Sequence, residues 1–306
     1  MGIQVQVCIP HFFNESQRSV ENYGSCREGG RLARSLALAR CLSSVIALRG
    51  SQIDFELNIG DKAIDVFPRQ SSPGLGAKNV VNVEITVCTV GDSCLKDVLG
   101  LYDANISVLK LNLENPRHLG LATRDHLIHH LPSADLFLYL EDDLVIHDRL
   151  YLEKLIWFYS QTKHQMCLMP HRYEMCYAQG GGRLYVDGPP SAKAIRKFIK
   201  PRVAAAEGRF QGRVISFDVA SNPHSGSFCI SLPQVKQLRK KSLPTSGFAG
   251  PLETAATYTV MKYFPVLKSS RQYIDFFEIE HAHPSFLGHF NSFPVRNASS
   301  NSSVRS

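Results

Sequence analysis

The sequence predicts an α/β fold in which helices cover both faces of a mostly parallel sheet. Three observations favour it. The first 160 residues read strand–helix–strand–strand–helix–strand–helix, the alternation typical of such sandwiches. The strand-like segments are apolar and are followed by proline, glycine or acidic residues. At 306 residues, of which 44% are apolar, the chain can also bury the large core that this fold requires.

Each element follows from its local pattern. Residues 3–9 alternate between apolar and polar and then meet Pro10, which indicates a first strand and its exit. Residues 31–48 have helical spacing, and we expect the buried face to consist of Leu32, Leu36, Ala39, Leu42 and Ile46. Further strands are expected at 80–90, 106–111, 136–140 and 228–232, and further helices at 119–131, 148–162 and 251–263.

Charge and cysteine content limit the class of protein. The net charge is +7, but no nucleic-acid-binding motif accompanies it, so we expect no nucleic-acid partner. None of the eight cysteines has C-x2-C spacing, which argues against a zinc ribbon and favours reduced thiols. The chain opens on a strand pattern rather than a signal peptide, and Arg34 and Arg40 interrupt its longest apolar helix. We therefore expect a cytoplasmic protein without a transmembrane segment.

The most informative segment is a run of acids at the end of a predicted strand. Residues 136–143 read Leu-Phe-Leu-Tyr-Leu-Glu-Asp-Asp. Carboxylates at the end of a buried strand cost several kcal/mol unless a cation or hydrogen-bond donors compensate. The usual arrangement is a strand whose carboxyl end opens into a crevice that holds a divalent metal and an anionic ligand. A plain strand followed by a solvated acidic turn is the alternative.

Three segments, taken in order, resemble a known superfamily. Val7-Cys-Ile-Pro-His-Phe-Phe-Asn-Glu resembles the first strand and uracil-side loop of nucleotide-sugar glycosyltransferases with the GT-A fold. Leu119-Gly-Leu-Ala-Thr-Arg-Asp resembles the helix start that faces the nucleotide-sugar in those enzymes. Leu140-Glu-Asp-Asp-Leu-Val-Ile-His-Asp is similar to the Glu-Asp-Asp version of the DXD motif in N-acetylglucosaminyltransferase I and its relatives. The resemblance covers residues 3–165 and extends less closely to 290.

This resemblance implies both an architecture and an activity. The fold would be GT-A, a Rossmann-like α/β/α sandwich, in a single domain over 1–290. Residues 1–165 would bind the nucleotide-sugar and residues 166–290 the acceptor, with a disordered tail over 291–306. The activity would be metal-dependent transfer of a hexosyl or N-acetylhexosaminyl group from a nucleotide-sugar, and the expected donor is a UDP-sugar. The acceptor would be a hydroxyl of a glycan or another molecule, with inversion at the sugar carbon.

The resemblance also assigns residues to roles. Asp143 would ligate Mn²⁺ or Mg²⁺, with a histidine from the cluster Glu280-His-Ala-His-Pro as a further ligand. His281 and His283 are both candidates, and the backbone that Pro284 fixes favours His283. Glu253, at a predicted helix start, would be the base that deprotonates the acceptor. The residues expected to contact the nucleotide-sugar are Pro10, His11, Asp92, Arg124, Glu141 and Asp142.

The chemistry of the residues supports these roles without deciding them. A departing nucleoside diphosphate carries negative charge, which Mg²⁺ or Mn²⁺ held by one or two carboxylates can neutralise. An acid in the first turn of a helix, as Glu253 is, is also favoured by the helix dipole alone. Histidines are often structural. Ser225-Gly-Ser is either a glycine loop beside the donor sugar or a routine turn.

Other classes remain open to different degrees. A nucleotidyltransferase would carry a glycine-rich basic loop after the first strand, but no glycine follows Pro10 until Gly24. A metal-dependent hydrolase could use Asp142, Asp143 and the histidines, although no H-E-x-x-H pattern is present. A catalytically inactive GT-A-like protein that binds a glycan or nucleotide is the third alternative.

Overall fold

A computed structural model describes residues 2–14, 29–50, 53–68, 80–177, 181–189 and 206–296. Its centre is a five-stranded sheet with the order β13-β6-β1-β4-β5. The strands β6, β1, β4 and β5 are parallel, and β13 pairs antiparallel with β6 at one edge. The bounds are β1 Ile3–Pro10, β4 Val81–Val90, β5 Ser107–Leu111, β6 Leu136–Leu140 and β13 Ser227–Ser231.

Helices pack on both faces of this sheet. Val5 and Val7 of β1 share one core with α1, α2 and α4, whereas Cys8 and Phe137 share another with α3, η3, α6, η5 and α8. Strands covered on both faces read as continuous apolar runs, as β6 does. The predicted α/β sandwich with a mostly parallel central sheet is confirmed. The bounds are α1 Arg31–Ile46, α2 Lys96–Gly100, α3 Leu119–Asp125, η3 His126–His130, α4 Tyr151–Gln161, α6 Leu232–Leu238, α7 Pro251–Glu253, η5 Thr254–Tyr258 and α8 Thr259–Met261.

The buried face of α1 differs from the predicted one. Leu32 and Leu36 are 71% and 57% exposed, so they do not belong to the core. Both the predicted and the observed buried positions recur every three or four residues. Helical spacing alone therefore cannot decide which of the two faces of this helix is buried. Arg34 lies on the inward face because its charge meets buried acids there. The buried residues are Arg34, Ala37, Leu38, Cys41, Leu42 and Val45.

Two further four-stranded sheets, with the orders β10-β9-β15-β7 and β11-β12-β14-β8, build the second half of the chain. The first of them brings β15 beside β7, which directly follows the acidic run. The bounds are β7 Leu144–Val145, β8 Cys167–Leu168, β9 His171–Met175, β10 Arg183–Tyr185, β11 Ala206–Phe210, β12 Arg213–Val219, β14 Val266–Ser269 and β15 Glu278–His281. Short 3-10 turns complete the described chain at η2 Pro116–His118, η6 Arg271–Phe276 and η7 Leu287–Asn291.

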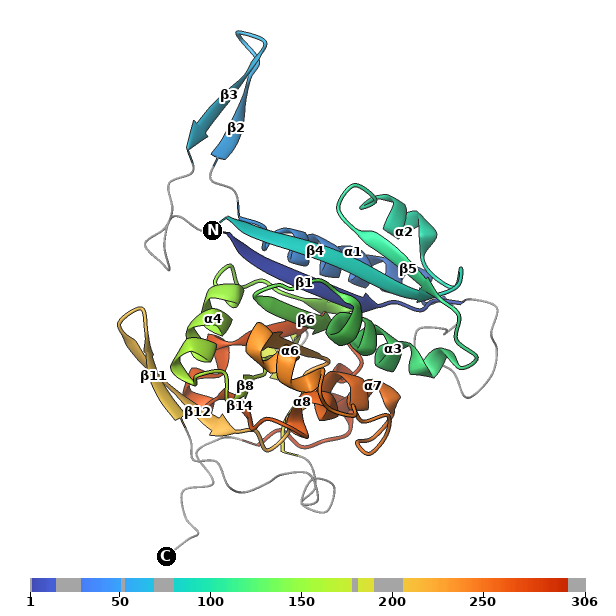
Figure 1. The fold of residues 1–306 in the computed structure, drawn as a ribbon, viewed down its shortest axis with the longest axis vertical. Helices are drawn as coiled ribbons and strands as arrows, with labels where there is room; N and C mark the ends of the chain where they lie inside the picture. The colour runs from blue at the N-terminus through green and yellow to red at the C-terminus, as the bar shows by residue number, and fades with distance from the viewer. Residues whose placement is uncertain are drawn as a thin grey trace, which may run out of the picture.

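A hairpin that the sequence pattern did not predict joins α1 to β4. Its strands are β2 (Ile53–Asn58) and β3 (Ala63–Pro68), which pair only with each other. Figure 1 shows the hairpin standing clear of the rest of the described chain. The alternating sequence of β2 and β3 is typical of strands, but it occurs beside Ser/Pro/Gly-rich residues that read as loop.

Most other predicted elements have their expected type. Residues 119–131 and 251–263 are helical, although each contains a turn of π-helix, η3 and η5. The seven described cysteines are free. No helix in the described ranges is long and apolar enough to cross a lipid bilayer. The tail predicted over 291–306 lies outside the described residues from 297 onward.

Candidate functional site

The acidic run lies at the carboxyl edge of the central sheet, next to the end of β1. Strands β1 and β6 are parallel neighbours, so the residues that follow them meet at this edge. Asp142 Oδ2 lies 2.6 Å from Nδ1 of His11, a residue with no exposed surface. The backbone N–H of Leu95 donates to Nε2 of the same imidazole at 3.0 Å. His11 therefore carries its proton on Nδ1 and donates it to Asp142.

A single arginine from α1 bridges the two aspartates. Arg34 donates to Asp142 Oδ1 and to Asp143 Oδ2, the second at 2.9 Å. Burial alone would raise the pKa of Asp143, but the ion pair with His281 and the charge of Arg34 hold it well below the ordinary value. Both aspartates are thus ionised at neutral pH. Arg34, which pairs with both aspartates, balances part of their negative charge. A buried charge without such a partner would be costly.

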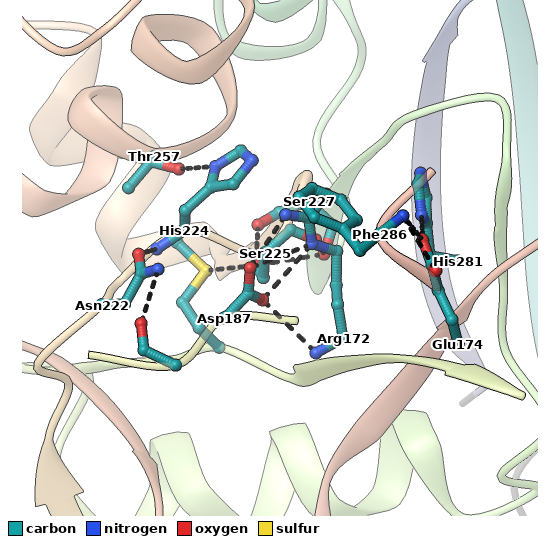
Figure 2. Close-up of polar contacts among 12 residues, drawn as sticks. Arg172, Glu174, Asp187, Asn222, His224, Ser225, Ser227, Thr257, His281 and Phe286 are labelled. Atoms are coloured by element: carbon teal, nitrogen blue, oxygen red, sulfur yellow. Dashed lines mark hydrogen bonds and ion pairs between the residues drawn. The ribbon is translucent and has the colours of Figure 1, made fainter. Parts of the chain in front are cut away.

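A second cation reaches Asp143 from β15. Nε2 of His281 lies 3.6 Å from Asp143 Oδ2, and its Nδ1 lies 2.8 Å from Glu174 Oε1. Burial opposes the charged imidazole, but the ion pair with Asp143 and the hydrogen bond to Glu174 raise the pKa of His281 to about 9. Figure 2 shows Glu174 beside His281 and Phe286. Glu174 also accepts the backbone N–H groups of Ser285, Phe286 and Leu287, which fixes the segment that follows His281.

His283 differs from His281 in being uncharged. Burial and the nearby charge of Arg34 lower its pKa, so the ring is neutral at pH 7. Its side chain makes no hydrogen bond to the part of the chain that the structure describes. Asp143 Oδ1 is buried and has no hydrogen-bond partner either. Among the described residues at this edge, Asp143 and His283 thus each keep a possible ligand atom without a hydrogen-bond partner.

A divalent ion bound at Asp143 and His283 would need further ligands from a bound phosphate or from water. No group of three His, Cys, Asp or Glu side chains within the described residues could hold a metal by itself. Mg²⁺ and similar ions are commonly held by one or two carboxylates together with phosphate oxygens and water. An ion at Asp143 and His283 would thus take most of its ligands from phosphate and water.

Glu141 is the neutral member of the acidic run. Burial and the negative charge of Asp143 raise its pKa to about 8, with a further contribution from Glu253. Its backbone N–H donates to Gly226 O at 3.1 Å. A Cβ at Gly226, where φ is +62°, would lie 2.6 Å from Glu141 Oε2. The Ser225-Gly-Ser turn therefore adjoins the acidic run, and it requires its glycine.

Glu253 lies near Glu141, since its charge is among the causes that raise the pKa of that residue. It is the third residue of α7, and its Oε2 accepts the N–H of Gly250 at 2.9 Å. This bond caps the start of the helix, so Glu253 has a structural role whether or not it also takes part in a reaction. The same carboxylate is only partly buried, so the capping role leaves it accessible to a ligand.

The other residues expected to contact a nucleotide-sugar lie in different surroundings. Pro10 ends β1 opposite Cys88. Asp92 follows β4 on the surface, where it pairs with Lys96 and Lys110 at 3.3 and 2.9 Å. Arg124 is only 1% exposed. Its hydrogen bonds go to Asp125, Pro244 and Thr259. The guanidinium therefore joins α3 to later segments and not to the acidic run at 141–143.

A second charged cluster, which the sequence analysis did not find, consists of Asp187, Arg172 and Lys268, and the charge of Arg172 acts on Glu141. Asp187 accepts from Arg172 at 2.8 Å and from Lys268 at 3.3 Å. Figure 2 shows Arg172 and Asp187 together, with His224 bonded to Thr257 nearby. Arg172 and Glu174 alternate with His171 and Tyr173 along β9, a pattern equally typical of a strand facing water. Only Lys268, enclosed in the apolar strand β14, was a sequence signal of buried charge.

Comparison with known proteins gives weak structural similarities. No protein-family model matches the chain, and no curated protein sequence matches it. The structure of S. aureus TarS 1–349 has a TM-score of 0.43 and 11% identity, over 88% of this chain and 58% of that one. Its complex with UDP-GlcNAc gives 0.41 and 10%, over 92% and 61%. The 4-diphosphocytidyl-2C-methyl-D-erythritol synthase of Anaerococcus prevotii gives 0.38 and 11%, over 90% and 94%. The chain thus spans about three fifths of the TarS 1–349 structures, and 35% of a longer TarS structure.

Proposed function

We propose that the protein is a glycosyltransferase that moves a sugar from a nucleotide-sugar to an acceptor hydroxyl, with a UDP-sugar as the preferred donor. One observation supports this most. At the carboxyl edge of a parallel sheet, Asp143 keeps a buried oxygen without a partner, although Arg34 and His281 surround it. Ligands of open α/β sheets bind outside the carboxyl ends of the strands. An ionised carboxylate with unused capacity there suits a metal–diphosphate ligand.

The cations around the acids would bind the leaving diphosphate. Arg34 is held by two aspartates and His281 by Glu174, so both are fixed before a ligand arrives. Preorganised cations stabilise charge that develops in a transition state without reorganising. A bound Mn²⁺ or Mg²⁺, held by Asp143 and His283, would supply further neutralisation of the diphosphate. Asp142, fixed by His11, would contact the nucleoside.

Two glutamates would divide the remaining work at the sugar. Glu141 is protonated at neutral pH, so it can donate a hydrogen bond to a sugar hydroxyl but cannot act as a base. Glu253 is near it and partly accessible. We assign Glu253 as the base that takes the proton of the acceptor hydroxyl, which corresponds to an inverting reaction.

The proposal is tested by measuring melting temperature with nucleotides and nucleotide-sugars, each with and without Mn²⁺. Binding stabilises the folded state by mass action. We expect a UDP-sugar to raise the melting temperature more than UMP does, and more with Mn²⁺ than without. Asp143→Asn should lose the Mn²⁺-dependent part.

Three results would reject the proposal. Stabilisation by CTP followed by release of pyrophosphate would indicate a nucleotidyltransferase. Hydrolysis that requires Mn²⁺ but no nucleotide would indicate a metal-dependent hydrolase. Donor binding without transfer to any hydroxyl, from monosaccharides to polyols, would indicate a binding protein.

A further inference from the structure

His224 is a partly exposed histidine on the loop before β13, and it has no role in the proposed reaction so far. In the antiparallel pair of β13 and β6, Ser227 lies opposite Leu140, the residue that precedes the acidic run. The loop before Ser227 therefore lies at the same carboxyl edge of the sheet as Glu141. Gly226 of this loop is the residue whose added Cβ would touch Glu141. His224 thus belongs to the edge at which a ligand is expected.

Three hydrogen bonds hold His224 in place. Its backbone N–H donates to Asn222 Oδ1 at 3.2 Å, and its carbonyl accepts from Lys268 Nζ at 2.7 Å. Its ring Nδ1 lies 2.8 Å from the hydroxyl oxygen of Thr257, in the π-helical turn that directly follows Glu253. Figure 2 shows the imidazole turned towards Thr257. The ring is therefore fixed before a ligand arrives, beside the turn that follows the candidate base.

The imidazole of His224 is uncharged, and its bond to Thr257 decides which nitrogen carries the proton. Burial and the charges of Arg172, Lys268 and His281 lower its pKa to about 3, so the ring has one N–H and one lone pair. The Thr257 side chain is fully buried, and its hydroxyl has no other partner among the described residues. Because buried polar groups are nearly always satisfied, this hydroxyl donates its hydrogen to Nδ1. The proton of the imidazole is then on Nε2.

The Nε2–H group of His224 is available to a ligand. It has no acceptor within the part of the chain that the structure describes. The buried side-chain atoms that lack a hydrogen bond there do not include it, so it has access to solvent. An uncharged N–H donor suits an uncharged oxygen, such as a hydroxyl or an amide carbonyl. The charged groups of a diphosphate are better matched by the cations beside Asp143.

We infer that His224 binds the transferred sugar, through a hydrogen bond from Nε2–H to a hydroxyl or amide oxygen of an uncharged hexose or N-acetylhexosamine. The inference rests on the proposed function, since it requires a nucleotide-sugar along this edge. The cations beside Asp143 would hold the diphosphate, and His224 would hold the sugar near Glu253. Thr257 is then a positioning residue, because its hydroxyl fixes both the orientation of the ring and its tautomer.

The test compares the affinity for a nucleotide-sugar with the affinity for the same nucleotide without its sugar, by calorimetry with Mn²⁺ present. UDP-glucose, UDP-galactose and their N-acetylated forms are the uncharged donors, and UDP-glucuronate is a charged one. We expect His224→Leu to weaken binding of the best uncharged donor by about three- to tenfold, the contribution of one hydrogen bond. Its affinity for UDP should be unchanged, because UDP lacks the sugar.

Further variants separate contact with the sugar from a structural role. His224→Gln keeps an N–H donor at the end of the side chain and should retain donor affinity within about threefold. Thr257→Val should weaken donor binding by about two- to fivefold without affecting UDP, and Thr257→Ser should restore it.

His164→Leu is the matched control. This histidine is also partly exposed, and its Nδ1 lies 2.9 Å from a hydroxyl, Oγ of Ser231. Ser231 pairs with Leu136, at the opposite edge of the sheet. Donor affinity in His164→Leu should therefore stay within about twofold of the wild-type value. Circular dichroism and melting temperature verify that each variant folds.

The outcomes distinguish this contact from the proposed function. A chain that binds none of these nucleotide-sugars would reject the proposed function, and the contact with it. If donors bind but His224→Leu weakens them no more than His164→Leu does, only the contact is rejected. Equal weakening of UDP and its sugar conjugates would also reject it, since the effect would then not involve the sugar. UDP-glucuronate binding more tightly than every uncharged donor would overturn the assigned class of sugar.

Discussion

Two clusters of buried charge in this molecule differ in whether their carboxylates are fully bonded. In the closed cluster, Asp187 uses both oxygens to accept from Arg172 and Lys268, and its side chain is 3% exposed. In the open cluster, Asp143 accepts from Arg34 through one oxygen, while the other is buried without a hydrogen-bond partner. Buried polar groups are nearly always satisfied. Unused bonding capacity, and not burial of charge alone, therefore distinguishes a candidate site from a structural ion pair.

The largest effect is expected at Glu253, which lies near Glu141 of the acidic run. Glu253→Gln should lower turnover by about 10²–10⁴-fold, the range that general base catalysis supplies, with little change in donor affinity. Steady-state kinetics and titration calorimetry measure the two separately. Glu114→Gln, on an exposed glutamate, is the control. Normal turnover with weaker donor binding would move Glu253 from proton transfer to donor recognition.

The open cluster itself should respond in activity. Asp143→Asn should reduce transfer by about 10²–10³-fold, because it removes the charged oxygens that face the diphosphate and its metal. The melting temperature should change little, since Arg34 keeps Asp142 as its partner. Transfer at the wild-type rate would show that Asp143 has no part in the reaction.

The closed cluster should respond to the same substitution in stability. Asp187→Asn leaves Arg172 and Lys268 buried without a counter-charge, at a cost of about 3–5 kcal/mol in the free energy of unfolding. Urea denaturation of this variant and of Asp143→Asn gives the comparison directly. If both variants lose the same stability, the distinction between open and closed clusters is wrong.

A smaller effect is expected from the neutral histidine at the open cluster. His283→Ala should weaken binding of UDP with Mn²⁺ by about tenfold, because phosphate and Asp143 still hold the ion. Binding of UDP without Mn²⁺ should be unchanged. Calorimetry with and without the metal separates the two, and equal losses would make His283 a phosphate contact or a packing residue.

The smallest effect concerns pH and the histidine beside the closed cluster. Burial and the charge of Arg172 lower the pKa of His224 to about 3, from an ordinary value of 6.5. Below pH 6.5 the unfolded chain therefore binds a proton that the folded protein does not, and stability falls as the pH falls towards 3. We expect a loss of about 1 kcal/mol for one pH unit, which His224→Gln should remove. Urea denaturation at several pH values above 4.5 tests this, and an unchanged slope in the variant would contradict it.

Local patterns in the sequence predicted the central sheet because its inner strands have clear apolar or alternating patterns. Residues 136–140, for example, are apolar throughout, and this strand lies inside the sheet between β13 and β1. The same reasoning placed Leu32 and Leu36 wrongly on the buried face of α1, whereas Arg34 is buried; Leu42, from the same predicted face, is buried as expected. The partner that buries Arg34 is Asp143, 109 residues further along the chain. Spacing within a helix carries no information about such a partner.

In the candidate site, too, the residues at strand ends were predictable and the directions of helical side chains were not. The acidic run and His11 lie at strand ends, and the ends of parallel strands meet by necessity, so their proximity follows from the sheet. The direction of a helical side chain does not follow in this way. Arg124 turns towards Pro244 and Thr259, which no motif could indicate. The roles proposed for Glu253 and His283 remain predictions.

The pairing of β15 with β7 also determines when the acids acquire their partners during synthesis. The N–H of Ala282 donates to Asp143 O at 2.7 Å, and His281 faces the same residue. A ribosome adding about 5–20 residues each second needs on the order of ten seconds to pass from Asp143 to that segment. Until then the emerging chain must balance its acids with what it already contains. Arg34 and His11 are made before the acids, so the nascent chain already contains a counter-charge, on Arg34, and a hydrogen-bond donor, on His11, when the acidic run appears.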